Sequence, residues 1–504
     1  MARGINPILD MDFPDPDVIR VGNIYYMVTT TMHFMPGCEI LQSYDLINWE
    51  HLTYVYDTLD STPAQKLDGD EYIFGKGMWA ATIRYHEGMF YILFVANDTQ
   101  KTYLYRSTDI TGPWQKSTVE GFYHDASLLF DNGKTYIVYG NTQIYLTELN
   151  DDLTGPREGG LHRLIVNDEG NPNLGLEGSH LYKIDGLYYL FMIHSRRDRW
   201  LRTEACYIAD SLEGDFIGGD VLEDGMDTGS GAAQGGIVDD GRGNWYSIVF
   251  LDSGAIGRIP VVVPVKIDGR KVTFGVDGKV PEIIETTDLR GENHAEKLKP
   301  LYGSDDFKEG INYFWQFSHE PDLSLVDVDT EEGVLRVTTD KLAKNLFHAR
   351  NVLTQRMKRP ACEAEVTVDG SGLNDGDYAG LSVYQGDFAI VGITKRDGKL
   401  YAVMKNNNSM DNTWNLTENP GEEQALIPIE GESLRIKIKC DFSGGKDEAV
   451  CSIMNNNAWE QIGSTHKMHF RLDHFTGARF GLFVYSTEQT GGTASFRGFV
   501  FKVD

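Results

Sequence analysis

Residues 88–96, Gly-Met-Phe-Tyr-Ile-Leu-Phe-Val-Ala, place a turn residue directly before a β-prone run. The same Gly-x-x-Tyr phrase occurs five times in the first half of the chain, at Gly22/Tyr25, Gly88/Tyr91, Gly133/Tyr136, Gly186/Tyr189 and Gly243/Tyr246. Successive glycines are 66, 45, 53 and 57 residues apart, as expected for units of about four short strands. The sequence therefore predicts an all-β protein that begins with a five-bladed β-propeller.

A second phrase supports this division into blades. Polar turns follow four of the Gly-x-x-Tyr runs, at residues 43–50, 107–116, 149–156 and 209–216. Each is expected to close an outer hairpin of its blade, because turn-forming residues separate β-prone runs there. No sustained helical period interrupts residues 1 to about 280.

The second half of the chain has a different pattern. Residues 283–305 are polar and lack a strand pattern, which predicts an interdomain linker. Alternating strands then return without the Gly-x-x-Tyr repeat. We expect a catalytic propeller over residues 1–290 and a β-sandwich of jelly-roll, lectin-like type over residues 305–504.

Composition narrows the class of partner. The formal charge of −29 repels nucleic acid and anionic membranes, so neither is expected as a partner, and a neutral ligand fits better. Aromatic residues make up 11% of the chain, which suits β-sheet cores or sugar-stacking surfaces. No apolar run is long enough to span a bilayer.

Cysteine usage and the first residues bear on the compartment. The five cysteines are odd in number and not spaced like zinc ligands, so free and mostly buried thiols are expected. The start of the chain shows no signal-peptide apolar core. We expect a cytoplasmic protein, with a secreted or periplasmic form whose signal was removed as the alternative.

The repeats also align one residue per blade at the head of each inner strand. These head residues, which lie seven to nine residues before the hairpin glycine, are Asp15, Trp79, Asp125, Glu177 and Gln234. Each could be an ordinary turn or strand-start residue, since aspartate is common in turns. Three carboxylates at the one position that the repeat makes axial favour a functional site at the mouth of the channel.

Three acids and a tryptophan at one site suit glycoside hydrolysis. One carboxyl group protonates the leaving oxygen and a second activates water or attacks the anomeric carbon. A third acid can raise the pKa of the general acid by like-charge repulsion. Trp79 would offer a flat face to a sugar ring. Arg258 could hold sugar hydroxyls or a pocket carboxylate, although an arginine taken alone is more often a surface or turn residue.

The ordered motifs FPDPD (13–17), GMWAATI (77–83), HDASL (124–128), LEGSHLYK (176–183), AAQGGIV (232–238) and GRIPVVVPV (257–265) resemble glycoside hydrolase family 43. Members of that family are five-bladed enzymes that remove xylose or arabinose from plant cell-wall polysaccharides. Residues 315–337 and 349–356 resemble the sandwich appended to its longer β-xylosidases and arabinofuranosidases. The resemblance covers most of the chain.

The resemblance implies a role for each matching residue. Asp15 corresponds to the general base of an inverting mechanism, Asp125 to the residue that modulates the pKa of the acid, and Glu177 to the general acid. Arg258 matches the family arginine that contacts sugar or the modulating aspartate. These three acids are the ones that the repeat alignment had selected.

Two positions depart from the family pattern. Many relatives carry a histidine in the fifth blade that ligands calcium or its waters, whereas this chain has Gln234, so calcium is left open as a structural or axial ion that the chemistry does not require. Met32 and His33 replace an aromatic residue and an acid at a wall of the sugar pocket. His33 could bind a hydroxyl or be structural, and His194 could line the pocket or be a satisfied blade histidine. The Arg196–Arg199 run is expected to be a solvated turn.

These observations predict an exo-acting, inverting glycosidase that releases terminal xylose or arabinose, or both, from small xylo- or arabino-oligosaccharides. The alternatives are an inactive carbohydrate-binding protein and a retaining five-bladed fructan hydrolase. A homo-oligomer is left open.

Overall fold

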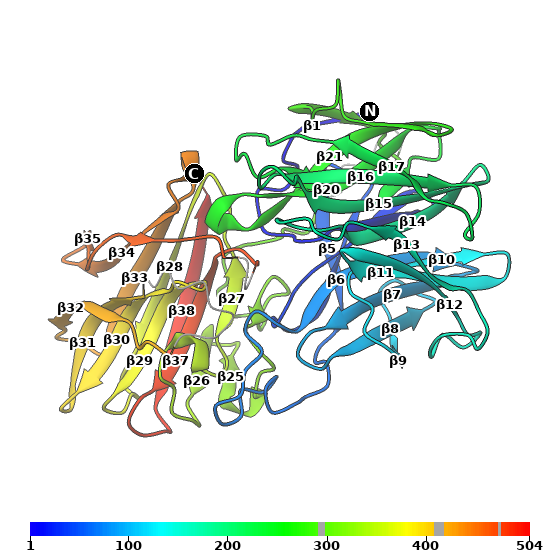
Figure 1. Cartoon of the computed structure of the whole chain (residues 1–504). Helices are drawn as coiled ribbons and strands as arrows, with labels where there is room; N and C mark the ends of the chain where they lie inside the picture. The colour runs from blue at the N-terminus through cyan, green and yellow to red at the C-terminus, as the bar shows by residue number, and fades with distance from the viewer. Residues whose placement is uncertain (291–297, 408–417, 472–474, 504) are drawn as a thin grey trace.

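The computed structural model describes residues 1–290, 298–407, 418–471 and 475–503. Two all-β halves lie side by side in Figure 1, the first running from blue to green and the second from yellow-green to red. Among the described residues there is no α-helix, only four short 3₁₀ turns at Gly254–Ile256, Leu323–Leu325, Leu346–His348 and Ser443–Gly445. No helix of the described part is long and apolar enough to cross a membrane.

The first half is a propeller of five antiparallel sheets, each built from consecutive strands. Blade one contains β2 (Asp17–Val21), β3 (Ile24–Thr29), β4 (Gly37–Ser43) and β5 (Trp49–Tyr56); blade two contains β6 (Met78–His86), β7 (Met89–Ala96), β8 (Lys101–Ser107) and β9 (Gln115–Val119). Blade three contains β10 (Ser127–Asp131), β11 (Lys134–Asn141), β12 (Gln143–Leu149) and β13 (His162–Asn167); blade four contains β14 (Glu177–Ile184), β15 (Leu187–Ser195), β16 (Arg202–Ala209) and β17 (Ile217–Leu222). Blade five contains β18 (Ala232–Ala233), β19 (Ile237–Asp239), β20 (Trp245–Asp252), β21 (Arg258–Asp268) and β22 (Lys271–Phe274). The prediction of five blades is confirmed.

The Gly-x-x-Tyr phrases mark the hairpin between the two innermost strands of each blade. All five glycines have a positive φ, between 60° and 97°. A side chain added at any of them would meet no heavy atom within 4 Å. Glycine is therefore favoured there by the left-handed backbone and not by crowding. The polar phrases fall between the third and fourth strands of blades one to four, as predicted.

The second half is a sandwich of two antiparallel sheets, which confirms the predicted architecture. One sheet has the order β24 (Gln316–Phe317), β27 (Leu353–Arg356), β37 (Arg479–Ser486), β29 (Asp377–Tyr384), β30 (Ala389–Arg396), β31 (Lys399–Asn406) and β32 (Glu422–Pro428). The other has the order β25 (Val326–Asp329), β26 (Val334–Thr338), β38 (Thr493–Val503), β28 (Ala361–Asp369), β33 (Ser433–Asp441), β34 (Glu448–Asn455) and β35 (Ala458–Gln461), with β36 (His466–Lys467) beside β34. Inward-facing side chains of both sheets, such as Leu381 and Ile436, share one buried core.

The predicted linker begins later than expected. Residues Ile283–Thr286 form β23, which pairs with β1 (Ala2–Ile5) near the N-terminus. The prediction that this stretch lacks a strand is therefore wrong. The strand has too few residues to show an alternating apolar pattern in the sequence. Residues 291–297 of the linker lie outside the described residues. The predicted division into 1–290 and 305–504 stays a prediction, and it falls between β23 and β24.

The two halves are joined by polar and backbone contacts. Met35 and Phe317 exchange backbone hydrogen bonds of 2.9 and 2.7 Å, which link the first blade to β24. The buried guanidinium of Arg356 lies 2.6 Å from the Glu39 carboxylate. Removing one partner of such a buried pair is costly, because it leaves the other charge buried and unpaired. The five cysteines are free and buried, as predicted.

Candidate active site

A pocket of about 240 Å³ opens where the inner strands of the blades converge. Six residues selected from the sequence line it: Asp15, Trp79, Asp125, Glu177, Gln234 and Arg258. Seven further residues complete the lining: Ala80, His124, Asn141, Leu174, Trp200, Arg202 and Phe475. All five head residues that the repeat alignment selected therefore line one pocket.

The backbone turns sharply at the head positions. Asp15, Asp125 and Gln234 have φ values of 51°, 46° and 61°, in the left-handed region. Aspartate tolerates this region better than most residues, while glutamine there is uncommon. At Gly178 (φ 65°) an added Cβ would lie 2.8 Å from the Gln234 side chain. Strained backbone of this kind clusters at functional sites, where surrounding contacts hold it in place.

Asp15 is held by a hydroxyl and a guanidinium. Its side chain accepts a 2.5 Å hydrogen bond from Thr30 Oγ1 at one oxygen and a 2.5 Å bond from Arg258 at the other. Only 4% of the residue is exposed. With both oxygens bonded, the carboxylate has a fixed orientation toward the pocket, which a general base needs.

Arg258 is buried, not a surface residue. Its guanidinium carbon lies 4.3 Å from the centre of the Phe250 ring and 4.2 Å from that of Phe475. A second contact, of 3.3 Å, joins it to Asp252, which also binds Arg202 at 2.6 Å. Two arginines therefore face a cluster of carboxylates, and this balance makes several charges tolerable in one buried site.

His124 lies between the other two acids. Its Nε2 atom is 3.3 Å from Glu177 Oε2 and 3.7 Å from Asp125 Oδ2. Asn141 donates a 2.6 Å hydrogen bond to the same Glu177 oxygen. Glu177 thus has two neighbouring donors on one oxygen, and its side chain is about 15% exposed.

The surroundings shift the pKa values of Asp125 and Glu177 in opposite directions. Burial raises the pKa of Asp125 to about 7, His124 opposes this shift, and the charges of Glu177 and Asp15 add to it. Burial also raises the pKa of Glu177, but the hydrogen bond and charge of His124, then Arg202 and Arg258, lower it below its ordinary value overall. For His124, burial opposes charging, yet Asp125 and Glu177 raise its pKa to about 9. Carboxyl groups with such different environments are typical of acid–base catalysis.

The raised pKa of Asp125 predicts how stability depends on pH. Because the folded state holds this proton more tightly than the unfolded chain, Asp125 lowers stability as the pH rises from about 4 to about 7. We expect Asp125→Asn to raise the melting temperature above pH 7 relative to the native protein, with the difference vanishing below pH 4. Thermal unfolding from pH 4 to 8 measures this. A variant that melts lower than the native protein at pH 8 would show instead that His124 stabilises an ionised Asp125.

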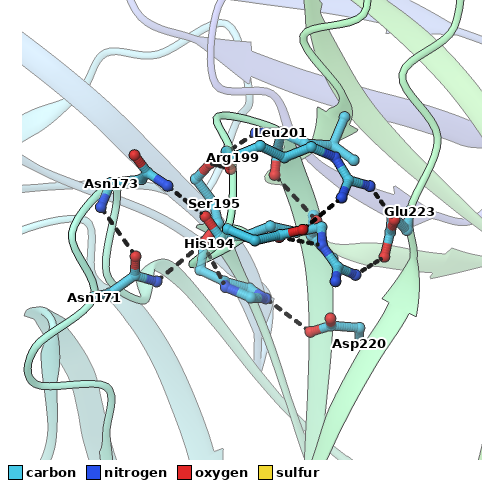
Figure 2. Close-up of polar contacts among 11 residues, drawn as sticks. Asn171, Asn173, His194, Ser195, Arg199, Leu201, Asp220 and Glu223 are labelled. Atoms are coloured by element: carbon cyan, nitrogen blue, oxygen red, sulfur yellow. Dashed lines mark hydrogen bonds and ion pairs between the residues drawn. The ribbon is translucent and has the colours of Figure 1, made fainter.

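Three predicted contact residues lie away from the pocket lining of the described structure. Met32 is buried and its backbone pairs with Met78. His33 is buried against Phe34, with ring centres 4.3 Å apart. His194 points toward Asp220, 2.7 Å from Nε2, and its Nδ1 donates to the Ser195 carbonyl at 3.1 Å (Figure 2). The structure therefore corrects the prediction that these three side chains contact the sugar. For His33 and His194 it agrees with the structural alternative, a packed or hydrogen-bonded histidine.

One group of side chains in the pocket could hold a metal ion, and it does not include Gln234. Among the described residues, the one group of three His, Cys, Asp or Glu side chains with converging ligand atoms is His124, Asp125 and Glu177, whose atoms lie within 4.8 Å of one another. Calcium prefers six to eight oxygen ligands, whereas this group offers a nitrogen and two carboxylates. A calcium ion near Gln234 stays a prediction, and no chemical step is assigned to a metal.

Several lining residues were missed by sequence reasoning. His124 stands beside Asp125 in the quoted motif and Asn141 ends the third Gly-x-x-Tyr run, so both had a local signal. Trp200 and Arg202 follow the arginine run that was interpreted as a solvated turn. Phe475 comes from the sandwich, and no local pattern could place it over a propeller 200 residues away in sequence.

A propeller whose axial pocket holds three carboxylates, two arginines and tryptophans has the fold and site of a glycoside hydrolase. Residues 5–200 match the model of glycosyl hydrolases family 43, and residues 304–502 match the β-xylosidase C-terminal concanavalin A-like domain. The chain is 30% identical to the non-reducing end α-L-arabinofuranosidase BoGH43B of Bacteroides ovatus, over 79% of this chain and 77% of that protein. This protein belongs to glycoside hydrolase family 43.

Other relatives are similar to this chain over nearly its whole length. A β-xylosidase of Formosa agariphila is 26% identical over 99% of this chain and 90% of its own length. Among solved structures, a bifunctional GH43-CE protein of Bacteroides eggerthii has a TM-score of 0.90 and 37% identity over 99% of this chain, which spans 64% of the length of that protein. A family 43 enzyme engineered to display both endo-xylanase and exo-arabinofuranosidase activity has a TM-score of 0.88 and 27% identity, with both chains fully covered.

Proposed function

We propose that this protein is an exo-acting, inverting glycosidase that removes terminal β-D-xylosyl or α-L-arabinofuranosyl groups from small oligosaccharides. The observation that carries the proposal is the convergence of Asp15, Asp125 and Glu177, each in a different environment, on one small pocket. The names of the relatives, β-xylosidase and α-L-arabinofuranosidase, indicate these two pentoses.

Pocket size and closure favour action at a chain end. The volume of about 240 Å³ is below the roughly 300–1,000 Å³ of pockets for drug-sized ligands, so a single pentose with part of the next sugar suits it. Phe475 of the sandwich lies beside Trp79, with ring centres 6.2 Å apart, and forms one wall. A wall of this kind opposes the passage of a polymer through the site.

In the proposed mechanism the acids act from opposite sides of the sugar. Asp15, held by Thr30 and Arg258, accepts a proton from the attacking water, while Glu177 gives a proton to the leaving oxygen. Burial and the charge of Glu177 raise the pKa of Asp125, while His124 lowers that of Glu177 against the effect of burial, so in the free protein Asp125 holds a proton more tightly than Glu177. His124 lies within reach of both and orients Glu177.

Trp79 supplies an aromatic surface for the sugar. It lines the pocket beside Phe475, so a flat indole face is available to the C–H groups of a sugar ring.

Rates measured side by side on p-nitrophenyl β-D-xyloside and p-nitrophenyl α-L-arabinofuranoside test the proposal. We expect turnover of at least one of them, and single pentoses released from the non-reducing end of oligosaccharides. Proton NMR of the first product should show the inverted anomer, since water attacks opposite the leaving group. Retained product, or cleavage only at internal bonds, would contradict the proposal.

A further inference from the structure

The loop between β15 and β16 places an exposed tryptophan at the rim of the pocket. Trp200 is 42% exposed, yet it lines the same pocket as Glu177. Exposed large hydrophobic residues are ordinary when scattered, but one that borders a pocket of buried carboxylates has a ligand within reach. No role in the proposed mechanism accounts for it so far.

Ion pairs hold this loop in a defined shape. Arg196 and Arg199 both bind Glu223, and Asp198 bridges the same two arginines at 2.9 and 2.8 Å. Arg197 pairs with Asp168 on the preceding loop. The run of arginines is thus paired with acids and not merely solvated.

Hydrogen bonds to backbone carbonyls fix the base of the loop. Asn171 donates to the Ser195 carbonyl at 2.9 Å and Asn173 donates to the Arg196 carbonyl at 2.6 Å. The Leu201 N–H donates to Ser195 Oγ at 2.9 Å (Figure 2). A loop with this many contacts is ordered before any ligand arrives, which lowers the entropic cost of binding to it.

The loop is tied to the segment that carries Glu177. The Ser195 N–H donates to the carbonyl of Leu174, a lining residue three positions before Glu177. The buried Arg202 guanidinium lies 5.3 Å from the centre of the Trp200 ring and covers part of the indole. With Arg202 beneath it and 42% of the residue exposed, Trp200 presents open aromatic surface at the pocket that Glu177 also lines.

The position of the acid gives the direction of the substrate. A general acid protonates the oxygen that links the released sugar to the next one, so the next sugar lies on the side of Glu177. We propose that Trp200 is the stacking platform for this leaving-side sugar, a pyranose ring whose flat C–H face packs on the indole. The inference rests on the proposed exo-glycosidase function and adds the leaving-side subsite to it.

The test compares a substrate with a leaving sugar and one without. The pair is a pentosyl disaccharide and the corresponding pentosyl fluoride, whose leaving group is too small to reach Trp200. For Trp200→Ala we expect the ratio of kcat/KM for the disaccharide to kcat/KM for the fluoride to fall about tenfold, the value of one aromatic contact. Trp200→Phe, which keeps a flat ring, is expected to restore most of the ratio.

Trp459 provides a matched control. It is a partly buried tryptophan on β35 of the sandwich, and its ring centre lies 4.5 Å from Lys437 Nζ. Trp459→Ala should leave the rates on both substrates unchanged. An unchanged ratio in Trp200→Ala, with both substrates still turned over, would overturn the platform. Failure of the native protein to turn over either substrate would instead overturn the proposed function.

Discussion

Glu177→Gln is expected to lower kcat on a pentosyl disaccharide by about 10²–10⁴-fold, the usual contribution of general acid catalysis. Glutamine keeps the shape of the side chain and can still accept the hydrogen bond that Asn141 donates to Oε2, but it carries no acidic proton. The second sugar of a disaccharide would leave as a poor alkoxide unless the linking oxygen is protonated, so the loss falls on the chemical step. KM is expected to change little.

The leaving group distinguishes a lost acid from a damaged fold. Fluoride and dinitrophenolate leave the anomeric carbon without full protonation, so Glu177→Gln should retain much more of its activity on pentosyl fluoride or a dinitrophenyl glycoside. Glu169→Gln, at an exposed turn before β14, serves as the matched control and should behave like the native protein. Equal losses on activated and unactivated substrates would remove Glu177 from the role of general acid.

The repeat explains why so much of the site could be predicted from sequence. In a propeller, equivalent positions of successive blades meet at the axis, so aligning the glycines also aligned the residues that converge in space. Asp125 and Glu177 are 52 residues apart in sequence yet share His124 as a neighbour. Periodicity thus replaced the long-range information that a single sequence usually lacks.

The errors came where periodicity gives no information. Met32 and His33 follow the second strand of blade one. A shift of one residue there decides whether a side chain points into the pocket or into the core. Phe475 reaches the pocket from another domain, and its position depends on how the two halves pack. A sequence repeat predicts neither the direction of a loop side chain nor the way in which two domains pack.

The electrostatics of the site also required the structure. The sequence predicted that a third acid would raise the pKa of the general acid, a role that the resemblance gave to Glu177; in the folded protein the raised pKa belongs to Asp125 instead. Burial and the charge of Glu177 raise the pKa of Asp125, against the effect of His124. For Glu177, burial also raises the pKa, but His124 and the two arginines lower it below its ordinary value. This outcome depends on separations of 3.3 and 3.7 Å that only the folded chain defines.

Asp15→Asn is expected to lower kcat by about 10²–10⁴-fold on every substrate, whatever its leaving group, because the attacking water then has no base to accept its proton. Asparagine retains an oxygen that can accept the bond from Arg258, and the Thr30 hydroxyl can accept a bond from the new amide, so the fold should survive. Thr30→Val is the graded control: it keeps the carboxylate and removes a single hydrogen bond, for which a loss of about tenfold or less is expected. The same series of leaving groups should therefore give a flat profile of losses for Asp15→Asn and a steep one for Glu177→Gln. A steep profile for Asp15→Asn would mean that this carboxylate assists the departure of the leaving group, and the assignment of base and acid to opposite sides of the sugar would have to be exchanged.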